Sequence, residues 1–291
     1  MRELLGGGLK PNEPRRFLLE AMIGAMHADG AVDARETAVL EHHLAQHPLF
    51  YGLGTAAART LISIATDAIK FSGTAAGRAP AIAKGLPARI HRLAAYAMAA
   101  EVAIADQSLH AGELAFLEAL RGSLRISPRE AEEIMGVAAA GRIGKYLEEI
   151  YVRIKSLVPH ACELFALRAL MRNTATDEHL LRIRALFEAV PDLQLPTTEI
   201  DGELLRAFRR PRSPTAQTLD ELAIVATRVP EYVDRYWLIV YALVAEAPAK
   251  VPQWRVRPFV RVVQAAFAIT DADMELAAVD ALMFPASLPR P

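Results

Sequence analysis

Apolar residues recur at three- and four-residue spacing in segment after segment of the chain, and alanine, leucine, arginine and glutamate dominate those segments. This spacing places apolar side chains on one face of an α-helix. No run alternates β-branched with polar residues between hairpin turns, as a half-buried strand would. The pattern therefore predicts an all-α protein built as a helical bundle.

Within this pattern one short segment occurs twice. The copies are Ala28–Glu36 (ADGAVDARE) and Ala105–Glu113 (ADQSLHAGE), and equivalent positions, such as Asp29 and Asp106, are 77 residues apart. In each copy an acidic residue follows an alanine-rich helix pattern, and a glutamate seven positions later opens the next one. The first half of the chain is therefore expected to contain duplicated helix-turn-helix units.

Capping signals set the ends of the expected helices. Asp33 fits an N-cap with Glu36 as its capping-box partner, and Ser127 with Glu130 forms the same signal further along the chain. The helices predicted from these signals and from the apolar spacing cover about residues 15–28, 34–46, 55–71, 88–105, 111–120 and 128–140.

An insertion rich in glycine and alanine separates the two copies, at about residues 51–87. Its first part is the predicted helix over 55–71. The following stretch, Ser72–Gly77, has the composition of a surface loop, and we expect a loop there rather than a functional lid.

Gly141 and Gly144 mark the expected domain boundary, because the repeat has ended before them. We expect one helical domain over residues 1–140. A second helical domain of unknown type covers 141–291, where prolines separate roughly seven shorter helices. Two of its turns, Asn173–Glu178 and Ile269–Glu275, faintly resemble the acidic turns. They are either helix caps, the interpretation we favour, or degenerate further copies.

Composition limits the class of partner. The 291-residue chain has 33 basic and 34 acidic residues and a formal charge of −1. This balance gives no field to attract nucleic acid or an anionic membrane, so a protein partner or another soluble ligand is expected. The one cysteine, Cys162, lies in an apolar helix pattern and is interpreted as a core residue.

Two further observations bear on localisation. The N-terminal residues lack the apolar run of a secretory signal. The apolar window 236–245 is far shorter than the roughly 20 residues that a membrane span needs. A cytoplasmic protein without a membrane span is therefore expected.

The duplicated turns are the candidate site. If the two hairpins pack with pseudo-twofold symmetry, five carboxylates converge there: Asp29, Asp33, Glu36, Asp106 and Glu113. Clustered carboxylate oxygens suit a hard divalent cation, with Ca²⁺ or Mg²⁺ favoured. Capping is the alternative explanation for Asp33, Glu36 and Glu113. It explains Asp29 and Asp106 less well, because the helix dipole disfavours an anion at a helix C-terminus.

The apolar helix that ends in Ala-Asp-Gly, the short turn and the glutamate-bearing helix resemble the tellurite-resistance protein B (TerB-like) family over about residues 15–140. The resemblance implies an all-helical domain with internal duplication, an acidic surface that binds a divalent metal, and a role in a bacterial stress response. The family's acidic positions match Asp29 and Glu36 in the first turn, and Asp106 and Glu113 in the second.

The second turn departs from the family pattern at two positions. Gln107 replaces a glycine, and His110 stands where the first turn has Asp33. The loss of a carboxylate at position 110 weakens a calcium-like site and admits a softer metal.

Three other sequence patterns are weaker indications of a functional site. His43 and His47 lie at i and i+4 on one helix face, a spacing that suits a transition metal, although the helix dipole favours histidine near a C-terminus in any case. Gly6–Gly8 lacks the preceding strand of a phosphate-binding loop. The basic stretch Arg206–Arg212 fits a solvated helix end better than a nucleic-acid contact.

No nucleophile elbow or dinucleotide fingerprint is present, so the sequence does not support an enzyme. Paired carboxylates without a substrate-binding motif are a weak basis for a hydrolase. The leading hypothesis is a non-catalytic, TerB-like stress-response protein that binds a divalent cation through its acidic turns. The alternative is a metal-free helical adaptor that binds another protein.

Overall fold

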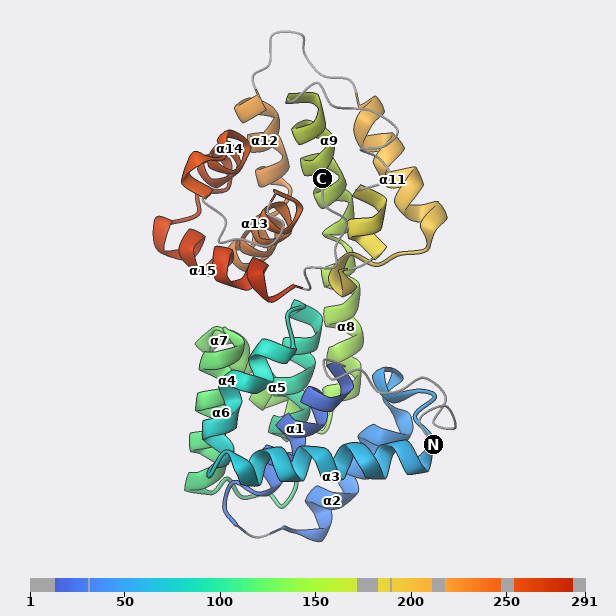
Figure 1. Cartoon of the computed structure of the whole chain (residues 1–291), viewed down its shortest axis with the longest axis vertical. Coiled ribbons are helices and arrows are strands. Elements are labelled where there is room, and N and C mark those ends of the chain that lie inside the picture. The colour runs from blue at the N-terminus through green and yellow to red at the C-terminus, as the bar shows by residue number, and fades with distance from the viewer. Residues whose placement is uncertain are drawn as a thin grey trace. The chain divides into compact units, whose positions relative to one another are not determined.

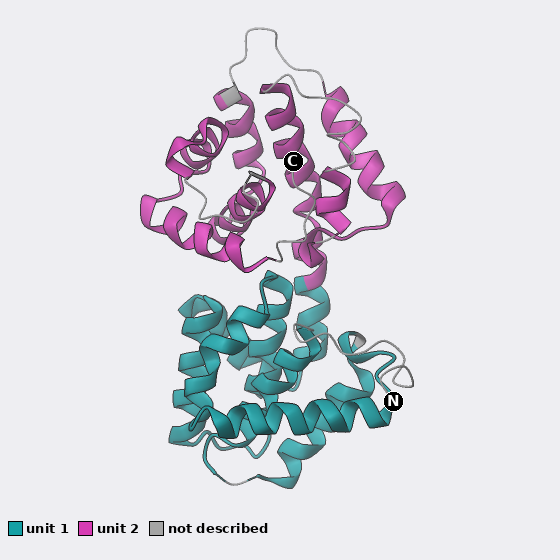
Figure 2. Cartoon of the chain, in the orientation of Figure 1, with its two compact units in different colours: residues 1–150 teal, residues 151–291 magenta. Residues whose placement is uncertain are grey.

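The structure is a computed structural model of the chain, and it describes residues 14–30, 32–171, 183–188, 190–210, 218–246 and 254–284. Every regular element in these ranges is an α-helix or a short 3₁₀ helix (η), with no strand among them, so the all-α prediction is confirmed. The chain divides into two compact units, residues 1–150 (unit 1) and residues 151–291 (unit 2), as Figure 2 shows. The division falls inside α8 (Ile143–Lys155), shortly after Gly141.

The helices of unit 1 follow the duplicated pattern. They are α1 (Pro14–Met26), α2 (Ala34–Gln46), η1 (Pro48–Phe50), α3 (Thr55–Phe71), α4 (Ala75–Gly85), α5 (Arg89–Ala103), α6 (Ala111–Leu124), α7 (Pro128–Ala139) and the first part of α8. α1 and α5, the helices that lead into the two acidic turns, pack against each other at the centre of the unit (Figure 1). Most of their residues are buried, and the small alanines of α5 allow this close approach.

The helices that leave the two turns cover this central pair. α2 packs on α5, and α6 packs on both α1 and α5. α2 and α3 span their predicted ranges, and both predicted capping boxes are present, Asp33 with Glu36 and Ser127 with Glu130. Local capping chemistry therefore sets these helix ends as the sequence indicates.

The prediction of a loop over Ser72–Gly77 is wrong for its last residues, because α4 begins at Ala75. Thr74 caps this helix by accepting a hydrogen bond from the amide of Gly77 at 3.0 Å. Gly77 and Pro80 normally disfavour a helix. Here packing against α1 and α6 stabilises α4 in spite of them. The Phe17 ring lies against Gly85, where a Cβ atom would come within 2.2 Å of the ring.

Unit 2 is also helical. Its elements are the rest of α8, α9 (Val158–Met171), a helical segment over 183–188, η2 (Pro191–Leu193), α11 (Thr197–Arg209), α12 (Thr218–Thr227), α13 (Tyr232–Glu246), η3 (Trp254–Val256), α14 (Pro258–Phe267) and α15 (Asp271–Met283). α9 and α13 contribute fully buried residues such as Phe165 and Leu243 to one hydrophobic core. Cys162 has no exposed surface, as predicted for a core residue, and burial raises the pKa of its thiol.

One of the two turns that faintly resemble the repeat can be assigned. Thr270 caps α15 by accepting a hydrogen bond from the amide of Asp273 at 3.1 Å, so the cap interpretation is confirmed for that turn. The turn Asn173–Glu178 lies outside the described residues. In the part of the chain that the structure covers, the helices are all too short or too polar to cross a membrane.

Candidate functional site

The two acidic turns lie at the same end of unit 1 and contact each other through equivalent positions (Figure 1). Arg35, in the first turn of α2, donates from Nη1 to the backbone carbonyl of Asp106 at 3.1 Å. Its equivalent, Gly112 in the first turn of α6, lies against the backbone carbonyl of Ala28. The first turns of α2 and α6 therefore each contact the acidic turn of the other copy. We call this region the turn junction.

Both glutamates of the repeat serve as caps. Glu36 accepts a hydrogen bond through Oε2 from the amide of Asp33 at 2.7 Å, and Glu113 does the same for His110 at 2.7 Å. The side chain of Asp33 completes the first capping box by accepting from the amide of Glu36, and its Oδ1 also accepts a hydrogen bond from the amide of Arg35 at 2.7 Å. The capping explanation thus holds for Asp33, Glu36 and Glu113.

Asp33 and Asp106 are stabilised in their charged forms by their own turns. The side chain of Arg35 lies 3.1 Å from Oδ1 of Asp33, and this hydrogen bond lowers the pKa of that carboxyl group. Asp106 accepts hydrogen bonds from the hydroxyl of Ser108 at 2.6 Å and from its amide at 2.8 Å, which lowers the pKa of Asp106. His110 lies 3.8 Å from the same carboxylate.

The second turn has a residue in the left-handed backbone conformation at the same position as the first turn, although that residue is not a glycine. Gly30 has φ +87°, a conformation that glycine adopts freely, and Gln107, its equivalent, has φ +67°. The replacement seen in the sequence therefore leaves the backbone path of the turn similar. Ala31, the next residue of the first copy, lies outside the described residues.

The two capping glutamates are buried among like charges. Glu36 is 5% exposed and Glu113 is 2% exposed. Burial raises the pKa of both carboxyl groups, and the negative charges of Asp29 and Asp106 raise both further. The charge of Glu113 adds to the effect on Glu36. Carboxylates from both copies therefore act on one another across the turn junction, as the duplicated pattern suggests.

A comparison with protein-family models identifies this part of the chain. Residues 15–136 match the model described as tellurite resistance protein TerB. Residues 15–136 are therefore similar to TerB. The match runs from the first helix into α7 and so includes both acidic turns, but it does not extend into unit 2. Searches of curated proteins and of solved structures gave no match.

The donor set of the turn junction suits a hard cation only in part. All its candidate ligands are carboxylates, and two of them, Glu36 and Glu113, are buried and repelled by neighbouring carboxylates, a repulsion that a cation would relieve. However, nowhere in the described residues do three or more histidine, cysteine, aspartate or glutamate side chains form a group able to hold a metal ion. Cation binding at the junction would therefore require side-chain rearrangement.

The sequence suggests that His43 and His47 could bind a transition metal together, but in the structure each has its own protein partner. His43 is buried, and its Nε2 lies 2.8 Å from Oε2 of Glu101 on α5. His47 accepts a hydrogen bond at Nδ1 from the amide of Leu49 at 3.3 Å, and burial lowers the pKa of His47 to about 4. Sequence reasoning missed Glu101, although it is the one charged residue in the apolar stretch 93–105.

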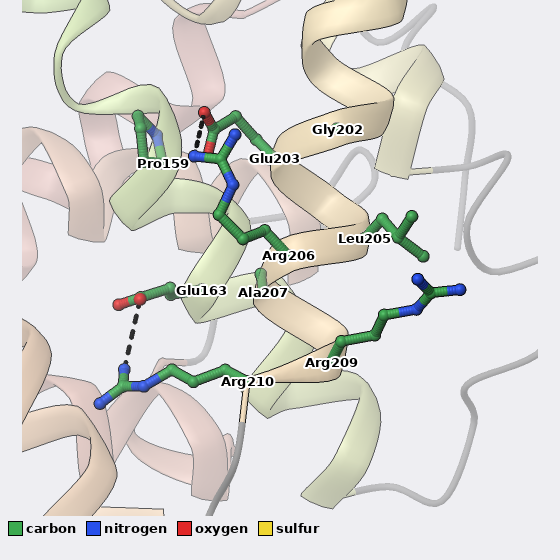
Figure 3. Close-up of a pocket in the computed structure, with 9 residues that line it drawn as sticks. All are labelled: Pro159, Glu163, Gly202, Glu203, Leu205, Arg206, Ala207, Arg209 and Arg210. Carbon is green, nitrogen blue, oxygen red and sulfur yellow. Dashed lines mark hydrogen bonds and ion pairs between the residues drawn. The ribbon is translucent and has the colours of Figure 1, made fainter.

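Unit 2 contains a pocket of about 660 Å³ between α9 and α11 (Figure 3). Arg210 on its wall lies 3.2 Å from Glu163, and Arg206 lies 2.9 Å from Glu203. Arg228 also pairs with Glu163 at 2.8 Å. Two arginines of the basic stretch, Arg206 and Arg210, are therefore paired with carboxylates.

Proposed function

We propose that the TerB-like region is a non-catalytic module that binds a divalent cation at the turn junction as part of a bacterial stress response in the cytoplasm. The observation that supports this most strongly is the burial of Glu36 and Glu113, two carboxyls from different copies, whose pKa values are raised by that burial and by the charges of neighbouring carboxylates. Asp29 and Asp106 contribute to the same field. A hard cation such as Ca²⁺ or Mg²⁺ would replace this repulsion with attraction.

The proposed ligands are Asp29, Glu36, Asp106 and Glu113. Asp33 was a fifth candidate from the sequence, but its Oδ1 already accepts hydrogen bonds from the amide and side chain of Arg35. In the described residues these side chains do not form a preorganised metal site, so part of the binding free energy is offset by the cost of rearranging them. We therefore expect weak binding, with Kd on the order of 10⁻⁴ M.

Thermal unfolding of the full chain tests this proposal. The protein is first treated with EDTA and then melted with Ca²⁺, Mg²⁺, Mn²⁺ or Zn²⁺ at about 1 mM, roughly ten times the expected Kd. A cation bound only by the folded state adds about 1.4 kcal/mol at that ratio, which raises the melting temperature by about 4 °C. Far-UV circular dichroism should follow the transition, because both tryptophans, Trp237 and Trp254, lie in unit 2 and do not report on unit 1.

Two variants make the test specific to the turn junction. Asp29→Asn/Asp106→Asn should abolish the cation-dependent rise. Asp33→Asn should retain it, because Asp33 is engaged by Arg35 and serves as a cap. The proposal is wrong if no cation raises the melting temperature, or if the double variant responds like wild type.

A metal-free adaptor is the second candidate. One observation favours it: Asp33, Glu36, Asp106 and Glu113 all hold hydrogen bonds within their own turns. Helix capping and turn formation therefore account for these four carboxylates without a metal. An adaptor would show no thermal response to any cation.

A further inference from the structure

The turn junction also exposes apolar side chains at equivalent positions. Val32 in the first turn is 48% exposed, and Leu109, 77 positions later, is 40% exposed. Leu114, in the first turns of α6, is 58% exposed. Single exposed aliphatic residues are common on protein surfaces. Here, however, both copies of a repeat present one at the same place.

The contacts of the junction bring the segments that carry these residues to one end of unit 1. Val32 lies three residues before Arg35, which donates to the carbonyl of Asp106. Leu109 lies three residues before Gly112, which lies against the carbonyl of Ala28. The two turns are thus held side by side, and Figure 1 shows them at one end of the unit. We call Val32, Leu109 and Leu114 the apolar turn residues.

The charge around these residues is strongly negative. Positions 28–37 and 105–114 contain five acidic residues and one arginine, a formal charge of −4 with histidine neutral, whereas the whole chain carries −1. Glu36 and Glu113 are buried, so Asp29, Asp33 and Asp106 are the carboxylates that can face a partner. Such a field repels nucleic acid, an anionic membrane and a second copy of the same surface. It attracts a positively charged partner.

We propose that the turn junction docks a basic amphipathic segment of another protein, with the apolar turn residues contacting its apolar side chains and the surrounding carboxylates facing its lysines and arginines. Apolar contact at the centre with complementary charge around it is how amphipathic segments are generally recognised. The proposal does not depend on cation binding, because the apolar turn residues are not ligands. It assigns a partner chemistry to the surface that the repeat forms.

Fluorescence anisotropy with a labelled synthetic peptide provides the test. The probe is an amphipathic helical peptide of about four turns, with leucine on one face and lysine on the other. A matched peptide with glutamate in place of every lysine serves as its control. The full-length protein is titrated in EDTA, so that cation binding does not contribute, at low and at physiological ionic strength.

Wild-type protein should bind the lysine peptide and not the glutamate peptide, and the affinity should fall as salt is added. Val32→Ser/Leu109→Ser should weaken binding about tenfold, since two aliphatic contacts are lost. The same variant should keep the cation-dependent rise in melting temperature. Asp29→Asn/Asp106→Asn should weaken peptide binding and reduce its salt dependence.

A matched control separates a specific surface from general stickiness. Val279 in α15 of unit 2 is 45% exposed, and Val279→Ser should bind the lysine peptide like wild type. The docking proposal is overturned if Val32→Ser/Leu109→Ser binds as tightly as wild type, or if Val279→Ser weakens binding to the same extent. If wild-type protein binds the lysine peptide but no cation raises its melting temperature, only the proposed cation site is overturned.

Discussion

Gly112 lies so close to Ala28 that a Cβ atom added to the glycine would be 2.2 Å from the backbone carbonyl oxygen of Ala28. A backbone atom cannot move aside as a side chain can, so even alanine at position 112 forces the turn and the helix apart. This contact lies between the two copies of the repeat and fixes the start of α6 against the first turn.

Gly112→Ala should therefore lower the free energy of unfolding by about 3 kcal/mol. Gly122 lies in the same helix with no atom near its would-be Cβ, so Gly122→Ala should instead stabilise by about 1 kcal/mol through helix propensity. Urea unfolding followed by circular dichroism measures both. Equal stabilities for the two variants would mean that the turns do not pack this closely.

The ion pair between Arg78 and Glu20 should anchor α4 to α1. Glu20 is fully buried, and its two carboxylate oxygens face Arg78 at 2.8 and 3.2 Å. Arg78→Ala leaves this carboxylate with Arg16 as its remaining ion-pair partner, so we expect a loss of about 2 kcal/mol. Lys84→Ala, at an exposed position of the same helix, should cost less than about 0.5 kcal/mol. A comparable loss for both variants in urea unfolding would refute the anchoring role.

Glu36 and Glu113 should make unit 1 less stable as the pH rises. Their folded-state pKa values lie above the ordinary value of 4.5, so the folded state binds more protons than the unfolded state just above that pH. Their contribution to stability is therefore greatest in acid and is lost as the pH rises through the raised pKa values.

Glu36→Gln/Glu113→Gln removes this titration and keeps an oxygen to accept the capping hydrogen bond. The stability of the variant relative to wild type should increase as the pH is raised from about 4.5 to neutrality, and then level off. Urea unfolding at a series of pH values checks this difference. A difference independent of pH would show that folding does not raise the pKa values of the two carboxyl groups.

His47 should remain neutral well below the usual range for histidine. Burial lowers its pKa to about 4, and the nearby His43 adds to the effect. The folded state thus binds fewer protons than the unfolded state between about pH 4 and 6.5, and stability from this residue is lost on acidification through that window. An NMR titration, with the ring signal assigned from His47→Gln, should give a midpoint near 4. A midpoint near 6.5 would contradict the buried environment.

The sequence predicts those features of unit 1 that depend on local chemistry. Capping residues such as Asp33 and Ser127 act within one turn of the chain, so the starts of their helices follow from spacing alone. α4 was missed because Gly77 and Pro80 are normally helix breakers, and contacts from distant helices overcome that preference.

The candidate site follows the same division. The duplicated spacing indicates that carboxylates of both turns share one region, and the raised pKa values of Glu36 and Glu113 agree with that. The pairing of His43 with Glu101 and the contact of Arg35 with Asp106 join residues far apart in the chain. Such pairings depend on tertiary packing, which a single sequence does not specify.

The central claim, that the turn junction binds a divalent cation, is tested most directly by NMR with Mn²⁺. Mn²⁺ broadens the signals of nearby amides, so adding it in small amounts to EDTA-treated protein locates the bound ion. We expect the amides of residues 29–36 and 106–113 to broaden first, and Asp29→Asn/Asp106→Asn to abolish that selectivity. Broadening centred on His43 and His47, or spread evenly over the chain, would contradict the account.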